Sequence, residues 1–185
     1  NNQHVEQNRQ LLKRQLDLPA SPDWLNQTHS TRAVDLATNR SRDADAAFTN
    51  IPGQVAVVLT ADCLPVLLCN RNGSEVGAAH AGWRGLLNGV LENTIHAMHS
   101  APEQLTAWLG PAIGPLKFEV GEEVRTAFIA QDEVLEASFI PNRPQHYLAD
   151  LYAIARYRLN KLGVYPICGG DYCTFTQSEQ FFSYR

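Results

Sequence analysis

Residues 61–85 read ADCLPVLLCNRNGSEVGAAHAGWRG, and this stretch decides the fold that we expect. Two short apolar runs, 65–69 and 75–79, flank the segment NRNG, whose Asn-Gly step is typical of a turn between paired strands. Both runs are apolar nearly throughout, as strands covered on both faces are. The stretch therefore predicts neighbouring strands of a buried sheet.

The flanking segments extend this sheet and begin to cover it. The Val-rich run 54–60 predicts another buried strand, and 105–110 a short one. Apolar residues recur every three or four positions over 81–99, which predicts a helix with one face packed inward. The two Gly-Pro steps of 110–115 predict a rigid loop without regular structure.

Three further segments have helical periodicity: 3–16, 121–137 and 148–162, the last ending at Gly163 as its cap. Strands and helices interleave without regular alternation. We therefore expect a mixed-sheet α+β or α/β fold rather than a doubly wound one, formed as a single domain over residues 1–185.

Composition excludes several classes of protein. Hydrophobic residues make up 44% of the chain and charged residues 18%, as in ordinary globular proteins. A net charge of −4 offers no broad cationic face for nucleic acid, and no apolar run is long enough to span a membrane. The four cysteines, too few for a disulfide framework, are interpreted as thiols. Without an export signal, a cytoplasmic location is expected.

Three residues near the predicted sheet can bind a metal. Cys63 follows a strand and precedes a proline, and His80 lies between a strand and a helix among small residues. A lone cysteine is more often a small buried apolar residue, His80 could be a buried core histidine, and His29 an exposed surface one. Together, however, they form the N and S donor set of a catalytic zinc site with an open fourth position.

Two neighbouring residues could assist such a site. Arg84 offers a planar donor fork for phosphate or carboxylate, and Asp62 could orient a ligand or move a proton. A surface ion pair and a turn cap are equally good readings of these two residues. Zinc nucleobase deaminases are excluded because Gly82 stands where they have glutamate, and neither a phosphate loop nor a nucleophile elbow is present.

The segments TADCLPVLLCN, VGAAHAGWRG, LGPAIGPLKFEVGEEV and GGDYCTFTQSEQFFSYR resemble the YfiH family, long labelled laccase-domain or polyphenol oxidase proteins. The resemblance runs from about residue 24 to the last residue. It implies a central β-sandwich of mixed sheets flanked by helices, and zinc bound by His29, Cys63 and His80. Relative to that family, the chain is expected to lack an N-terminal segment and a strand after the strand-like run 181–185.

The resemblance also implies an activity. Family members are described as purine nucleoside phosphorylases acting on adenosine, inosine, guanosine and 5′-methylthioadenosine, with adenosine deamination alongside. Purine nucleoside and phosphate are then the expected partners, and the expected assembly is a monomer or weak homodimer. Cys63, His80 and Asp62 are the predicted catalytic residues, Arg84 the predicted substrate-binding residue, and Cys173 a supporting one.

Two other enzyme functions compete with this one, and a third alternative is a non-catalytic, metal-stabilised scaffold that binds a partner, which is disfavoured because a structural zinc usually has four protein ligands. In the first, Cys63 is the nucleophile and His80 its base, in an amidohydrolase or an editing enzyme for peptidoglycan precursors. In the second, copper replaces zinc in a polyphenol oxidase. Six histidines are few for the several copper ions of a laccase, which makes the copper enzyme the less favoured alternative.

Overall fold

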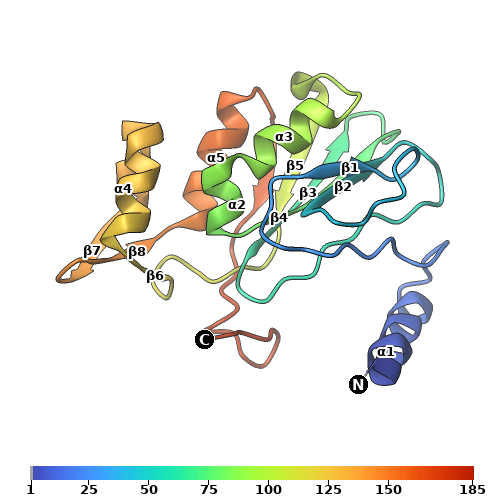
Figure 1. The fold of residues 1–185 in the computed structure, drawn as a ribbon, viewed down its shortest axis with the longest axis horizontal. Coiled ribbons are helices and arrows are strands. Elements are labelled where there is room, and N and C mark those ends of the chain that lie inside the picture. Colours follow the sequence, from blue (N-terminus) through green and yellow to red (C-terminus); the bar gives the residue numbers. More distant parts are fainter. Residues whose placement is uncertain (1) are drawn as a thin grey trace.

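The computed structural model of the chain describes residues 2–185 (Figure 1). Six strands form a mixed sheet in the order β1-β2-β4-β3-β5-β9, and three form an antiparallel sheet in the order β6-β8-β7. The larger sheet contains β1 (Ala33–Asp35), β2 (Ala46–Thr49), β3 (Leu64–Asn70), β4 (Val76–Ala81), β5 (Leu105–Leu109) and β9 (Ile167–Gly169). The smaller contains β6 (Glu119–Gly121), β7 (Phe139–Arg143) and β8 (His146–Ala149).

Helices flank the sheets, as expected for a mixed α/β fold, and that fold is confirmed. The helices are α1 (Asn2–Gln15), α2 (Trp83–Asn88), α3 (Val90–Ala97), α4 (Glu122–Gln131) and α5 (Leu151–Lys161), with 3-10 turns η1 (Pro102–Gln104) and η2 (Glu133–Ser138). Helices α2 and α3 pack on β4, and α5 packs on both helices, so all three cover one face of the larger sheet (Figure 1). Within residues 2–185, no helix is long and apolar enough to cross a bilayer.

The opening stretch forms the central hairpin of the larger sheet. Strands β3 and β4 pair antiparallel from Leu64↔Ala81 to Cys69↔Val76. Side chains of β3 alternate in burial, so Leu64 and Val66 enter the main core beneath the helices. The predicted strands at 65–69, 75–79 and 105–110 are confirmed, and all four cysteines are free thiols.

The predicted strand at 54–60 is wrong. This run is extended and half-buried, but its one strand-like pairing is a single bridge from Ala56 to Asp23. Ala56 packs on a second, smaller core on the sheet, formed by Val34, Leu36, Ala44 and Ala47, together with Leu25 from the preceding loop. No residue of the run 54–60 is fully buried, and Leu59 and Thr60 are exposed, so the expected burial on both faces is wrong as well.

Two predicted helices are shorter than expected. The helix over 81–99 is interrupted at Gly89, which takes a left-handed conformation (φ 95°) and donates its N–H to the carbonyls of Gly85 and Leu86. The segment 121–137 ends its α-helix at Gln131 and continues as a 3-10 turn. Helix α5 begins later than predicted because Asp150 caps it by accepting the Ala153 N–H.

The prediction for the C-terminal run 181–185 is wrong, and the one for the first helix is confirmed. The run 181–185 forms no strand, because the Tyr184 N–H donates to the side chain of Asp62 instead of to a neighbouring strand. Helix α1 is exposed as predicted and has no buried residue. It stands off the body in Figure 1, and Arg9 lies 4.4 Å from the ring centroid of Trp24.

Candidate functional site

Three separate segments bring His29, Cys63 and His80 together. His29 lies in the loop before β1, Cys63 directly precedes β3, and His80 is within β4. One candidate ligand atom from each residue lies within 4.8 Å of the others, and this is the one such cluster of three or more in residues 2–185. The Cys63 Sγ is 3.9 Å from His29 Nε2. The residues that the sequence singled out do meet in space.

Gly82 makes this approach feasible. A Cβ atom at Gly82 would lie 2.6 Å from the Cys63 Sγ and 3.4 Å from the His29 ring. Because Gly82 has no side chain, the backbone after β4 lies directly against the cysteine. The glycine of HAGWRG therefore has a spatial role at the cluster.

Asp45 holds two of the three residues. Its buried carboxylate accepts hydrogen bonds from the backbone N–H groups of Thr28, His29 and Ser30 at 2.7–3.1 Å, and from the Ser30 hydroxyl at 2.7 Å. It also lies 2.8 Å from His80 Nδ1. One carboxylate thus fixes the His29 loop, where His29 itself has a left-handed backbone (φ 60°), and the orientation of the His80 ring.

The donor set fits a zinc ion. Tetrahedral zinc has Zn–N distances of about 2.0 Å and Zn–S distances of about 2.3 Å, which puts ligand atoms roughly 3.3 to 3.6 Å apart. The 3.9 Å between Cys63 and His29 is close to this range, whereas the widest separation in the cluster, 4.8 Å, would contract by roughly 1 to 1.5 Å on binding an ion. Asp45 takes His80 Nδ1, so Nε2 is the nitrogen left for a metal, in the usual carboxylate–histidine–metal arrangement.

The pKa values at the cluster suit a metal better than a free nucleophile. Burial, with the nearby Asp62 and Asp45 carboxylates, raises the pKa of the Cys63 thiol. A free thiol there stays protonated at neutral pH, and a bound cation is what would ionise it. Burial and the neighbouring His80 lower the pKa of His29, which keeps its imidazole neutral and able to bind a metal.

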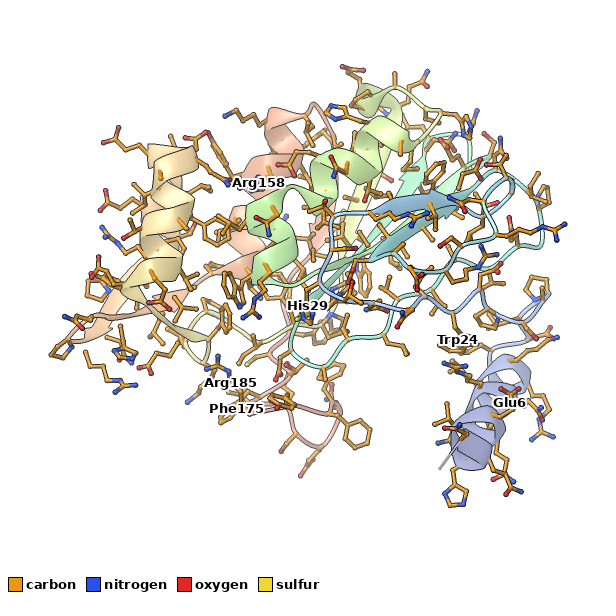
Figure 2. All side chains as sticks on the ribbon, in the orientation of Figure 1. Glu6, Trp24, His29, Arg158, Phe175 and Arg185 are labelled. Carbon is orange, nitrogen blue, oxygen red and sulfur yellow. The ribbon has the colours of Figure 1, made fainter. Side chains whose placement is uncertain are left out.

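The cluster lines a cleft of about 600 Å³. Its walls include Arg84 and the aromatic side chains of Trp83, Phe118 and Tyr184. In Figure 2, His29 lies beneath the sheet, and Arg185, which lines the same cleft, lies on the C-terminal segment below it. The cleft therefore combines metal-binding donors, cations and aromatic faces.

Arg84 is a cation of the cleft wall that could bind an anion. Its guanidinium lies 4.5 Å from the ring centroid of Trp83, and the arginine is exposed. Across the described part of the chain, no acidic side chain forms an ion pair with it. A planar cation without an acidic partner suits a phosphate or carboxylate group.

Asp62 lines the cleft beside Cys63, whereas Cys173 lies outside it. The Asp62 carboxylate accepts hydrogen bonds from Thr174, Ser183 and Tyr184, so it joins the C-terminal segment to the residue next to Cys63. The Cys173 Sγ accepts the Gly114 N–H at 3.2 Å and does not line the cleft. Neither residue joins the His29 cluster.

Sequence reasoning missed Asp45. Its signal was present in RDADAAF, where the second aspartate directly precedes an apolar strand; a buried acid there needs several hydrogen-bond donors. The donors come from residues 28–30, which only the folded chain brings near. Sequence spacing did not indicate that proximity.

The chain is similar in sequence to a known family and to several of its members. The sequence profile of the family described as "multi-copper polyphenol oxidoreductase laccase" matches residues 1–185. "Purine nucleoside phosphorylase YfiH" of Escherichia coli K12 is 54% identical over 187 residues, covering 100% of this chain and 76% of that protein. The chain belongs to the YfiH family. A Haemophilus influenzae relative, "Purine nucleoside phosphorylase", is 50% identical over 188 residues, covering 100% of this chain and 77% of that protein.

Solved YfiH-family structures share the fold. A Neisseria meningitidis protein matches with a TM-score of 0.94 and 45% identity, covering 100% of this chain and 76% of its own. The Bacillus licheniformis hypothetical protein YfiH matches with a TM-score of 0.90 and 26% identity over the same shares. The sequence resemblance to the YfiH family is confirmed.

Proposed function

We propose that the chain is a zinc-dependent purine nucleoside phosphorylase. One observation carries the proposal: the His29, Cys63 and His80 cluster faces the same cleft as Arg84, a cation without an acidic partner. The cleft volume of about 600 Å³ is in the range that holds a nucleoside-sized ligand. The names of the YfiH relatives support the choice of substrate.

Phosphorolysis makes specific demands on such a cleft. A phosphate oxygen bonds to C1′ of the ribose as the bond from C1′ to the purine breaks, and positive charge develops on the sugar. The site must hold the phosphate against the ribose in line with that bond. Arg84 would grip the phosphate through its paired N–H groups, which bind an anion strongly and directionally.

The metal cluster would act on the same bound ligand, because it lines the same cleft as Arg84. A zinc ion held by His29, Cys63 and His80 would supply Lewis-acid charge stabilisation for an oxygen at its fourth position. Asp45 would keep the His80 ring oriented and in one tautomer, because it holds Nδ1. The side chains of Trp83 and Phe118 would exclude water from the cleft walls.

Deamination of adenosine belongs to the same proposal. The three-ligand cluster leaves room for one further ligand, and either phosphate or water suits that position. Adenosine, inosine, guanosine and 5′-methylthioadenosine are the proposed substrates. The appearance of inosine from adenosine without added phosphate would separate deamination from phosphorolysis.

The competing functions fit the geometry less well. A cysteine nucleophile needs a lowered thiol pKa, whereas burial raises that of Cys63. His80 Nδ1 is already bonded to Asp45, and the imidazole nitrogen that contacts the Cys63 Sγ, at 3.9 Å, belongs to His29. A laccase needs further histidine clusters, but His99 pairs with Glu75, and His146 bonds the Pro144 carbonyl on the smaller sheet.

Replacing Arg84 with alanine tests the phosphate site. The variant should raise the KM for phosphate by about 10- to 100-fold, the loss expected for hydrogen bonds to a charged group, with a smaller change in the KM for inosine. Arg71→Ala is the matched control, because Arg71 is exposed, its guanidinium donates to the Tyr165 carbonyl at 3.4 Å, and it does not line the cleft. Hypoxanthine release from inosine would be followed at varied phosphate. Release at the same rate without phosphate would contradict phosphorolysis.

A further inference from the structure

Asp62, which lines the cleft, hydrogen-bonds to three other parts of the chain. Its backbone is left-handed (φ 79°), and its carbonyl accepts the Ile113 N–H at 2.9 Å. Its carboxylate accepts the Thr174 hydroxyl at 2.6 Å, the Ser183 hydroxyl at 3.0 Å and the Tyr184 N–H at 2.7 Å. The residue beside Cys63 therefore anchors the C-terminal segment at two points.

These bonds leave the carboxylate little freedom to act on a substrate. One Asp62 oxygen is held by Thr174, and the other by Ser183 and Tyr184. The residue is only 8% exposed. A buried carboxylate with both oxygens bonded to the protein fixes the position of its partners, and it is poorly placed to take a proton from a bound ligand.

Tyr184 is the partner that reaches the cleft. Its side chain lines the cleft, yet 92% of the residue is exposed. The two other aromatic side chains named in the wall already carry a cation: Arg84 lies over Trp83, and Arg185 lies 5.1 Å from the ring centroid of Phe118. No ring or cation in the described structure stacks on Tyr184. Within residues 2–185, Tyr184 is thus the aromatic residue of this wall that carries no cation, and its backbone is held in place.

We propose that Tyr184 stacks on the purine base of the nucleoside and that Asp62 is its positioning residue. This inference rests on the proposed function, whose reaction it supplies with a base-recognition group. Every base has a π face, so stacking on an aromatic ring gives affinity without selecting one purine by hydrogen bonds. Anchoring the backbone in advance lowers the ordering cost of binding.

The test compares variants of Tyr184. Tyr184→Ala raises the KM for inosine by roughly 5- to 100-fold, the range of base stacking, and changes kcat less. Tyr184→Phe keeps the ring and stays within about twofold of the unaltered chain. Phe182→Ala is the matched control, because Phe182 is 93% exposed two residues away and does not line the cleft. An alanine variant with an unchanged KM would overturn the stacking role.

Asp62→Ala tests the positioning role. The substitution removes both acceptor oxygens, so the Tyr184 N–H loses its partner and the anchor loosens. The KM for inosine then rises as in Tyr184→Ala, and the double variant is no worse than the worse single one, because both changes remove the same interaction. Additive losses would overturn the coupling. Ser183→Ala weakens the same anchor if Asp62→Ala does not fold.

A binding measurement separates this inference from the proposed function. Guanosine affinity is measured at equilibrium without phosphate, alongside the metal content of every variant. Weaker guanosine binding by Tyr184→Ala at full metal content supports stacking even if the unaltered chain releases no base. If the unaltered chain turns over inosine but binds guanosine no more tightly than Tyr184→Ala does, the stacking role is overturned and the proposed function is not.

Discussion

Replacing Cys63 with alanine should abolish zinc binding and phosphorolysis together. The Sγ is the one sulfur donor in the cluster, and the two imidazoles that remain form a weak site. Loss of an outer partner of a metal ligand typically costs 10- to 100-fold in affinity, so loss of a ligand should exceed about 100-fold. The measurement is zinc content after dialysis, together with the rate of hypoxanthine release.

Cys69→Ala is the matched control for this change. Cys69 is also a half-buried free thiol of the same hairpin, but it lies in β3 away from the cluster. It should retain zinc and activity while losing a similar amount of packing. If Cys63→Ala kept its zinc and its turnover, the cluster would not be the metal site, and the proposed function would lose its main support.

Asp45→Asn should produce the second large effect, on both stability and metal binding. The carboxylate is fully buried and is surrounded by four donors from residues 28–30 and by His80 Nδ1. Breaking a buried charged pair from one side costs about 3–5 kcal/mol, part of which the amide oxygen would recover. We expect about 2–4 kcal/mol less free energy of unfolding, and roughly 10- to 100-fold weaker zinc binding.

The nearby Asp43 offers a control with the same chemistry. It is exposed and accepts one hydrogen bond, from Asn26 at 2.8 Å. Asp43→Asn should change the free energy of unfolding by less than about 0.5 kcal/mol. Urea unfolding and a zinc competition titration would measure both variants. Equal results for the two aspartates would show that Asp45 does not hold the cluster.

Much of the fold could be predicted because its signals are local. The strands at 65–69 and 75–79 are marked by an Asn-Gly turn between apolar runs, and the structure pairs them as expected. The run 54–60 has the same apolar character, but it does not join the sheet, none of its residues is fully buried, and Ala56 is its residue that packs on the small core. Apolar composition alone therefore determines neither burial nor strand pairing, because both depend on which neighbours the chain brings alongside.

The site also contains residues that the sequence could predict and residues that it could not. His29 was ambiguous from its own surroundings, and the motifs shared with the YfiH family raised it to a predicted ligand before the structure placed it beside Cys63. The roles of Asp45 and Tyr184 had no comparable signal. Each depends on hydrogen bonds between segments far apart in the sequence, 16 residues from Asp45 to His29 and 122 from Asp62 to Tyr184.

One measurement tests the central claim most directly: metal content and inosine turnover determined on the same sample, before and after chelation. The cluster predicts about one zinc ion per chain, hypoxanthine release that requires phosphate, loss of that release with the zinc, and its return when zinc is restored. Phosphate-dependent release at an undiminished rate from metal-free protein, or a metal-replete protein that releases no base, would contradict it.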